Sequence, residues 1–387
     1  FQVKPSGVPQ MAALYEALPN FTEVLDDVKR HVALSQDSLD GLEVTPMLLL
    51  GPPGIGKTHF ARKLADLLGT GMSLVPMSPM TAGWLLSGAS SQWKGAKPGK
   101  RMGLQAGVHG DELNGTRAIH HLFERLDPLK LSGSVVAVIG ANSTGLLANS
   151  RYFQLQHDSG GGVDFNRIWP GKAEGNAAEQ QVYRLFNGIW LGNVDAVIDL
   201  HTQSTGTAYP LYIYADYRVA GVKQMAELIP ADIIKIDAGE PGAAEQAFNE
   251  AGMPSITLEI GAAKSYQPEL IARGLAGIDN IMKHYGMLSG KAGRDAKQQG
   301  TFIGNETRSI RALQGGFSEV LVALNQDVKS GQLLAVQRNG FGDVVARYTA
   351  PFDGRVASVG TDPLREPGAL LVRLIRVNTE PSCKDGC

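Results

Sequence analysis

The sequence predicts an α/β protein: a mostly parallel sheet flanked by helices, with a phosphate-loop segment before it and a small all-β domain after it. Before residue 100, the apolar run MLLL (47–50) enters a glycine-rich loop. From residue 101, apolar runs of strand length alternate with helical stretches, at 134–141, 177–190, 194–200, 254–260 and 269–288. After the polar stretch 289–300, short β-like runs separated by turns take over. We therefore divide the chain into a partial phosphate-loop segment (1–100), a central domain (101–290) and a C-terminal β domain (300–378).

Composition excludes several classes of partner. The formal net charge of -2 provides no excess positive field for nucleic acid or an anionic membrane surface, so we expect a small-molecule substrate. No apolar run approaches the roughly 20 residues that span a bilayer, and the first residues lack the basic-then-apolar order of a secretory signal. We therefore expect a cytoplasmic location. The two cysteines, Cys383 and Cys387, lie in a polar tail, where we expect them to remain reduced, with a local disulfide as the alternative.

The segment GPPGIGKT (51–58) fits the phosphate-loop pattern G-x-x-x-x-G-K-[ST]. Backbone N–H groups around Gly51, Gly54 and Gly56 would cradle the phosphates of ATP, Lys57 would reach the terminal phosphates, and Thr58 would hold Mg²⁺. Residues 11–99 resemble the start of a Lon-type AAA+ ATPase. Hydrolysis also needs a second strand ending in acidic residues, an arginine and sensor residues, and none of these precedes residue 100. We expect binding of ATP at most; the alternative is a loop that no longer binds nucleotide.

A metal-binding pattern follows in the central domain. In GVHGDE, His109 and Glu112 come directly after a strand, and we expect Glu112 in the first turn of the next helix. His201 ends the apolar strand 194–200, and the carboxyl ends of neighbouring parallel strands meet at one edge of a sheet. Two histidines and one carboxylate, with a position left for water, form a catalytic rather than a structural zinc site. Asp199 is a candidate to orient one of the metal ligands without binding the metal itself.

Four further polar residues complete the pattern. Glu259 closes the strand 254–260, where it would relay the proton of a metal-activated water to a leaving amine; the alternative is a glutamate that caps the next loop. Arg151 would polarise the scissile carbonyl. Asn166 and Arg167 would clamp a substrate carboxylate. Taken alone, arginines in a glycine-rich loop are more often surface charges.

Four motifs in this order, HGDE, RY…DFNRIWPG, DLH and LEIG, resemble the succinylglutamate desuccinylase/aspartoacylase family of zinc-carboxypeptidase-like hydrolases. The resemblance covers about residues 100–378. It implies a zinc-carboxypeptidase-like fold and cleavage of the amide bond of N-acyl amino acids, which yields a carboxylate and a free amine. It also implies the roles of seven residues. His109, Glu112 and His201 would bind zinc, and Glu259 would transfer the proton. Arg151 would polarise the scissile carbonyl, and the substrate carboxylate would bind to Asn166 and Arg167.

The N-terminal part departs from this family. Its members begin with strands ahead of the first metal-ligand strand, whereas this chain has the ATPase-like segment there, so we expect the sheet to lack an edge strand. The two resemblances meet within residues 94–101. In the terminal domain no lysine stands at the hairpin tip of a lipoyl- or biotinyl-type sandwich, so we expect a covering or homo-oligomerising module.

Three other functions stay open at the level of sequence. A zinc carboxypeptidase acting on peptides would use the same side chains. An ATP-driven or ATP-regulated protein would be centred on Lys57. A non-catalytic binding protein would have lost the metal at His109 and His201.

Overall fold

The computed structural model describes residues 11–36, 57–67, 90–155 and 161–387. Contacts within the chain separate two units, Phe1–Thr81 and Ala82–Cys387, and each is described by itself. In the described residues of the first unit the helical segments are α1 (Ala12–Ala17), η1 (Pro19–Phe21), α2 (Thr22–Gln36) and α3 (Lys57–Leu67). Phe21 stacks on Phe60 with ring centroids 4.5 Å apart and so joins η1 to α3 within one apolar core.

The predicted nucleotide site lies mostly outside the described residues. Gly51, Gly54 and Gly56 fall outside them, and Lys57 and Thr58 are described only as the first backbone positions of α3. The helix that the phosphate-loop pattern requires after its lysine is therefore present.

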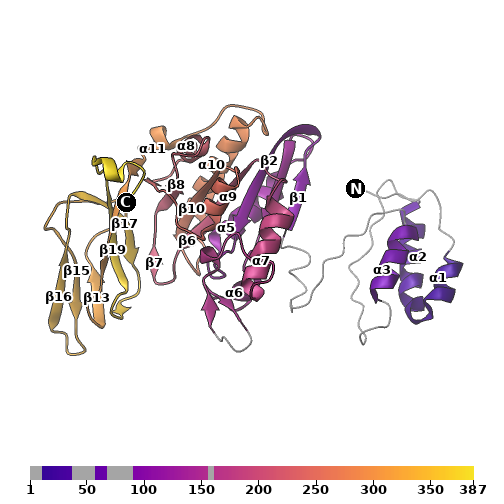
Figure 1. Cartoon of the computed structure of the whole chain (residues 1–387), viewed down its shortest axis with the longest axis horizontal. Coiled ribbons are helices and arrows are strands. Elements are labelled where there is room, and N and C mark those ends of the chain that lie inside the picture. Colours follow the sequence, from indigo (N-terminus) through magenta and orange to yellow (C-terminus); the bar gives the residue numbers. More distant parts are fainter. Residues whose placement is uncertain (1–10, 37–56, 68–89, 156–160) are drawn as a thin grey trace. The chain divides into compact units, whose positions relative to one another are not determined.

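An eight-stranded sheet forms the centre of the second unit, in the order β1-β3-β2-β6-β10-β8-β9-β11 (Figure 1). The β1–β3 and β10–β8 pairs are antiparallel and the other neighbouring pairs are parallel. Its strands are β1 (Ser90–Lys94), β2 (Lys97–Ala106), β3 (Ser132–Val138), β6 (Ala196–Gln203), β8 (Leu211–Ala215), β9 (Ile233–Ile236), β10 (Ser255–Ala262) and β11 (Phe302–Gly304). The predicted mostly parallel sheet is confirmed.

From the sequence we expected the sheet to lack an edge strand, but β1 forms that edge. Its residues pair antiparallel with β3, with Trp93 opposite Val135. The sequence SSQWK has a single strongly apolar residue and gives no period-2 signal, so only backbone pairing with β3 reveals the strand. The sheet thus begins ahead of residue 100, and that predicted boundary lies inside β2.

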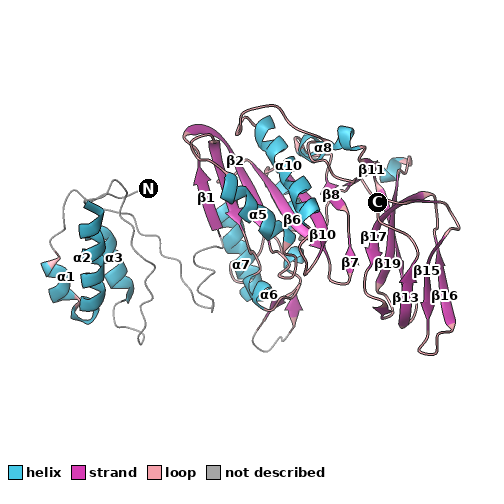
Figure 2. Cartoon of the chain, turned by 180° about the vertical axis from the view of Figure 1, so that it is seen from behind, coloured by secondary structure: helices cyan, strands magenta, loops and turns pink. Residues whose placement is uncertain are grey.

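Helices cover both faces of the sheet and make a three-layer structure. One face packs against α5 (Asn114–Arg125), α8 (Val222–Glu227) and α10 (Pro268–His284). The opposite face packs against α7 (Ala177–Leu185), the π-helical turn η3 (Phe186–Trp190) and α9 (Ala244–Glu250). Figure 2 shows α5 and α10 in front of the sheet, and Figure 1, turned by 180°, has α7 in front of it. Within the described chain, no helix is both long enough and apolar enough to cross a membrane.

Strand register places polar side chains in rows on the face covered by α7 and α9. On β6, Ile198 and Leu200 belong to the core on the α5 side, so Asp199 and His201 point to the other face. The register pairs Asp199 with Thr257 and His201 with Glu259 on β10. Buried polar residues on this face include Gln105, Asp199, His201, Thr257 and Glu259.

Short elements connect these layers: α6 (Ser143–Leu147), β4 (Phe153–Gln154), β5 (Gly162–Val163), η2 (Phe165–Arg167), β7 (Thr207–Ala208) and α11 (Ala296–Gln299). Beyond β11 the chain forms two antiparallel sheets packed on a common apolar core. Their strands are β12 (Glu306–Arg311), β13 (Gly316–Val320), β14 (Asp327–Val328), β15 (Leu333–Arg338), β16 (Val344–Thr349), β17 (Gly354–Gly360), β18 (Leu364–Arg365) and β19 (Leu370–Arg376). The predicted C-terminal all-β architecture is confirmed. Strand β7 of the central domain pairs with β17 and so joins the two β systems.

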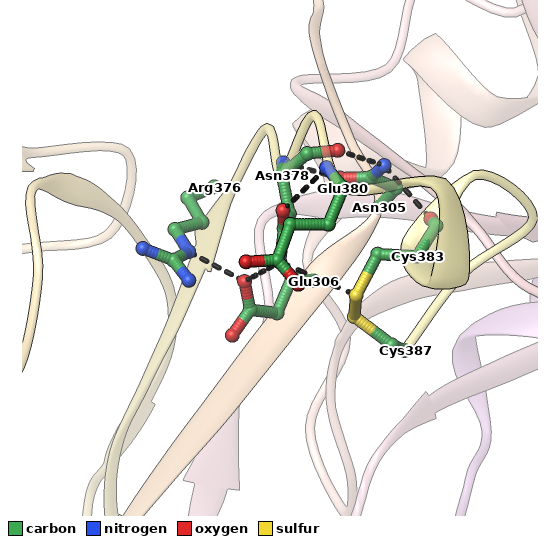
Figure 3. The surroundings of a disulfide bond; sticks show 7 residues. All are labelled: Asn305, Glu306, Arg376, Asn378, Glu380, Cys383 and Cys387. Atoms are coloured by element: carbon green, nitrogen blue, oxygen red, sulfur yellow. Dashed lines mark hydrogen bonds and ion pairs between the residues drawn. A yellow bond between two sulfur atoms is a disulfide. The ribbon is translucent and has the colours of Figure 1, made fainter.

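The two cysteines are joined in a disulfide, contrary to the expectation that they remain reduced (Figure 3). The short helical turn η4 (Pro381–Cys383) brings Cys383 close to Cys387. Around it, the Asn305 side chain donates hydrogen bonds to the carbonyls of Asn378 and Cys383, at 2.7 and 2.9 Å. The chain end is thereby fastened beside the junction of β11 and β12, a proximity that spacing in the sequence could not show.

Candidate metal centre and active-site pocket

The loop between β2 and α5 positions the first two ligands. Gly107 adopts φ +68°, which favours glycine, and turns the chain away from the sheet. The N–H of Glu112 donates to the carbonyl of His109 at 3.2 Å and closes the turn between them. Glu112 thus lies ahead of α5, which begins at Asn114, and not in its first turn as expected.

His109, Glu112 and His201 converge in the interior, each with at most 3% of its surface exposed. The two carboxylate oxygens of Glu112 lie 2.9 Å from His109 Nδ1 and 2.9 Å from His201 Nδ1. The two Nδ1 atoms are 3.2 Å apart. A tetrahedral ion with bonds of about 2.0–2.2 Å holds neighbouring ligand atoms roughly 3.3–3.6 Å apart, close to this arrangement. The structure therefore brings all three predicted ligands together as one metal site.

Carboxylates behind the histidines orient both rings. His109 Nε2 lies 3.1 Å from Asp164, and His201 Nε2 lies 3.0 Å from Asp199. In the neutral tautomer whose Nε2–H donates to Asp164 or Asp199, each ring leaves its Nδ1 lone pair free for a metal ion, on the side of Glu112. Three electron-rich groups at this separation repel one another unless a cation lies between them. The donor set therefore fits a divalent metal ion.

The charges of the site favour a cation for the same reason. Burial would raise the pKa of Glu112, but the two histidines hold it well below its usual range. Burial would lower the pKa of His201, whereas Asp199 and Glu112 raise it well above its usual range. The field that would retain a proton on His201 also attracts a metal ion.

Arg151 lies beside the metal ligands, in contact with three groups. Its guanidinium donates to Glu112 at 3.1 Å, to Ser204 at 3.0 Å and to Asp164 at 3.2 Å. Asp164 thus links Arg151 to His109. Sequence reasoning missed Asp164, although it stands in the motif DFNRIWPG directly before Phe165 and an acidic residue in such a loop was the available signal.

Glu259 lies next to His201 on the neighbouring strand and lines the same pocket. Its Oε2 is buried and forms no hydrogen bond with any described residue. Burial raises the pKa of Glu259 to about 8, against the opposing effects of His201 and Arg151. A carboxyl that is easily protonated and has a free oxygen is suited to accept and return a proton.

The metal ligands, Arg151 and Glu259 line a cavity of about 400 Å³. Its walls come from the central sheet, from the loop before α9 and from the C-terminal β domain, which contributes Thr307, Ser309 and Arg373. A pocket of this size suits a small molecule.

Asn166 and Arg167 line the cavity, but both are already engaged. Asn166 Oδ1 accepts a hydrogen bond from the N–H of Ala244 at 2.8 Å. Arg167 forms an ion pair with Glu240 at 2.8 Å, and both side chains are substantially exposed, at 41% and 61%. An exposed pair of this kind is weak.

Arg373 is a pocket residue that sequence reasoning missed. It forms no ion pair with any described carboxylate; its guanidinium hydrogen-bonds Tyr209, Tyr214 and Ser309 instead. The two tyrosine hydroxyls lie 2.6 Å apart, and both tyrosines line the pocket. Arg373 is far away in sequence, and only the docking of β19 brings it here.

A second cluster of possible ligands, Glu306 with Cys383 and Cys387, does not offer thiolates, because the two sulfur atoms form the disulfide.

Residues 98–285 match the family model for the succinylglutamate desuccinylase/aspartoacylase catalytic domain. This match confirms the family that the four motifs predict for the central domain. It begins after the phosphate loop and therefore lends no support to the ATPase resemblance.

Similar proteins agree with the match. The chain is 27% identical over 271 residues to an N-alpha-acetyl-L-2,4-diaminobutyric acid deacetylase of Halomonas elongata, over 66% of this chain and 76% of the relative. The product-bound ectoine utilization protein EutE (DoeB) of Ruegeria pomeroyi superposes with a TM-score of 0.66 at 23% identity, over 75% of this chain and 88% of that one. A succinylglutamate desuccinylase/aspartoacylase of Rhodobacter sphaeroides gives a TM-score of 0.65 at 20% identity, over 75% and 89%. These two structures establish the fold.

Together with the buried His–Glu–His site, the family match confirms the predicted enzyme class, a metal-dependent amidohydrolase that deacylates N-acyl amino acids.

Replacement of Asp199 by Asn should weaken metal binding by roughly tenfold to hundredfold, because the His201 ring loses the carboxylate that fixes its tautomer. Zinc affinity measured by competition with a chelator tests this. Asp195→Asn is the matched control, since Asp195 precedes the same strand but pairs with Arg101 at 2.8 Å. Equal affinities in both variants would contradict the orienting role of Asp199.

Proposed function

We propose, on the premise that residues 98–285 are a catalytic domain of the succinylglutamate desuccinylase/aspartoacylase family, that this chain is a zinc enzyme hydrolysing the amide bond of small N-acyl amino acids. The observation that carries the proposal is the buried His109–Glu112–His201 cluster beside the unpaired carboxyl of Glu259.

Zinc is the metal that the donor set favours. Two imidazoles and one carboxylate suit Zn²⁺, whereas Mg²⁺ and Ca²⁺ prefer shells made of oxygen. Zinc in such a site acts as a Lewis acid and lowers the pKa of a coordinated water to about 7.

Glu259 carries the proton in this proposal. It would accept the proton of the attacking water and return it to the amine that leaves when the amide bond breaks. Its free Oε2 and its raised pKa support both halves of this transfer. Arg151, held in place by Glu112 and Asp164, would stabilise the negative charge that develops on the carbonyl oxygen.

Asn166 and Arg167 are our candidates for holding the carboxylate of the amino acid. Asn166 uses its oxygen on Ala244, and its amide nitrogen forms no hydrogen bond with a described residue, so the nitrogen is available to donate. Arg167 would exchange Glu240 for the substrate in a two-bond contact.

The acyl group and the amino acid are to be found by a screen. We include acetyl and succinyl derivatives, and among the amino acids 2,4-diaminobutyrate, because the Halomonas relative is named for it. A carboxypeptidase would instead cleave short peptides with the same side chains, so dipeptides with free and blocked N-termini belong in the screen.

Glu259→Gln should lower kcat by roughly a hundredfold to ten-thousandfold while the enzyme keeps its zinc, because glutamine has the shape of glutamate but carries no proton between groups. Turnover and bound zinc are measured on the same sample. Glu250→Gln, an exposed change on α9, serves as the control. Near-normal turnover in the Glu259 variant would exclude this mechanism.

Arg167→Gln should reduce the preference for a free carboxylate over the matching carboxamide by roughly tenfold to hundredfold, as expected when a charged hydrogen bond is lost. The ratio of kcat/KM for the two substrates is the measurement. Arg373→Gln is the comparison, since Arg373 is the pocket arginine to which the proposed reaction gives no role. If only the Arg373 variant lost the preference, Arg373 and not Arg167 would be the residue that binds the substrate carboxylate.

The phosphate-loop motif gives a separate expectation, ATP binding with Mg²⁺ and without efficient hydrolysis. Lys57→Ala should abolish that binding, because the lysine contacts the terminal phosphates. Calorimetry on the wild type and the variant tests it. A wild-type protein that binds no ATP at millimolar concentration would dispose of the nucleotide site.

A further inference from the structure

Glu245 is a buried acidic residue of the pocket, and the proposed hydrolysis gives it no role. It lies in the first turn of α9, lines the cavity and is 6% exposed. Its Oε2 accepts a hydrogen bond from the Thr257 hydroxyl at 2.7 Å, whereas its Oε1 has no partner among the described residues. Buried polar atoms are nearly always paired, so an unpaired oxygen in a cavity wall indicates a ligand that donates to it.

The position of Glu245 ties it to the substrate. Its partner Thr257 lies two residues before Glu259 and on the same face of β10, so Glu245 is one side-chain step along the strand from the residue that moves the proton. A group on Glu245 would therefore belong to the same small molecule whose amide bond faces Glu259.

The surroundings of Glu245 favour a positively charged donor. Burial raises the pKa of Glu245 well above its usual range; Thr257 opposes this, and the carboxylates of Asp237, Asp199 and Asp216 add to it. The nearby cation Lys235 is already paired with Asp237. A ligand cation would both fill the free oxygen and relieve the repulsion among the acids.

We propose that Glu245 binds an ammonium group on the side chain of the substrate's amino acid, and that the enzyme prefers N-acyl derivatives of short diamino acids. This inference rests on the proposed deacylase function and deepens it. Glu245 is a specificity residue here and takes no part in proton transfer.

Three substrates of nearly equal size test the proposal: the N-α-acetyl derivatives of 2,4-diaminobutyrate, norvaline and glutamate, whose side chains are positive, neutral and negative. We expect the wild-type enzyme to favour the diaminobutyrate derivative over the norvaline derivative by roughly tenfold to hundredfold in kcat/KM, the size of a charged hydrogen bond. Glu245→Gln should bring this ratio close to one, with the norvaline derivative hydrolysed about as well as before.

Glu240→Gln is the matched control, because Glu240 is the exposed acid of the same pocket. Loss of the preference in the Glu240 variant with retention in the Glu245 variant would overturn the assignment. An equal or better rate with the glutamate derivative in the wild type would overturn it too, since Glu245 would then act as a protonated donor to an anion.

A measurement on the wild type alone covers the case in which Glu245→Gln does not fold. Calorimetry should show tighter binding of 2,4-diaminobutyrate than of norvaline by a similar factor, and equal binding would refute the ammonium site. If none of the N-acyl amino acids in the wider screen is hydrolysed, the proposed function fails. Hydrolysis without a preference for the amine defeats only the role of Glu245.

Discussion

The site depends on one electrostatic arrangement, two imidazole lone pairs and a carboxylate turned toward a common point. Asp164 and Asp199 create it by taking the opposite nitrogen of each ring at 3.1 and 3.0 Å. Without those carboxylates either ring could reverse its tautomer, and the cluster would become an ordinary set of buried hydrogen bonds. The repulsion that remains makes a bound cation favourable in an interior where an isolated charge is costly.

Sheet register transmits this constraint to the rest of the domain. Because side chains alternate along a strand, fixing His201 on one face also fixes Asp199, and the pairing with β10 then puts Thr257 and Glu259 in the same two rows. The ligand, the group that orients it, the proton carrier and the partner of Glu245 therefore share one face. A slip of one residue between β6 and β10 would turn these β10 side chains into the hydrophobic core on the opposite face.

The C-terminal β domain is part of the pocket as well as a cover. Strand β7 pairs with β17, and Tyr209 contacts Arg373 across the junction. Charges of both signs from both domains consequently line one cavity, among them Arg151, Arg167, Arg373, Glu245 and Glu259. Such a mixed lining matches amino-acid derivatives, which carry charges of both signs, better than long apolar ligands.

The sequence by itself determined the α/β class, the all-β end, the family and the three metal ligands, because those signals are local: a period of two or 3.6, a glycine turn, a histidine at the end of an apolar strand. It did not reveal β1, whose pairing is made by backbone groups common to every sequence, or the disulfide, which needs Cys383 and Cys387 to be brought face to face. Arg373 and Glu245 escaped notice because nothing adjacent in the chain distinguishes them from surface charges, whereas Asp164 was missed although it stands inside the motif DFNRIWPG. Only the tertiary structure, by removing them from water and aiming them at one cavity, decided which charged residues belong to the site.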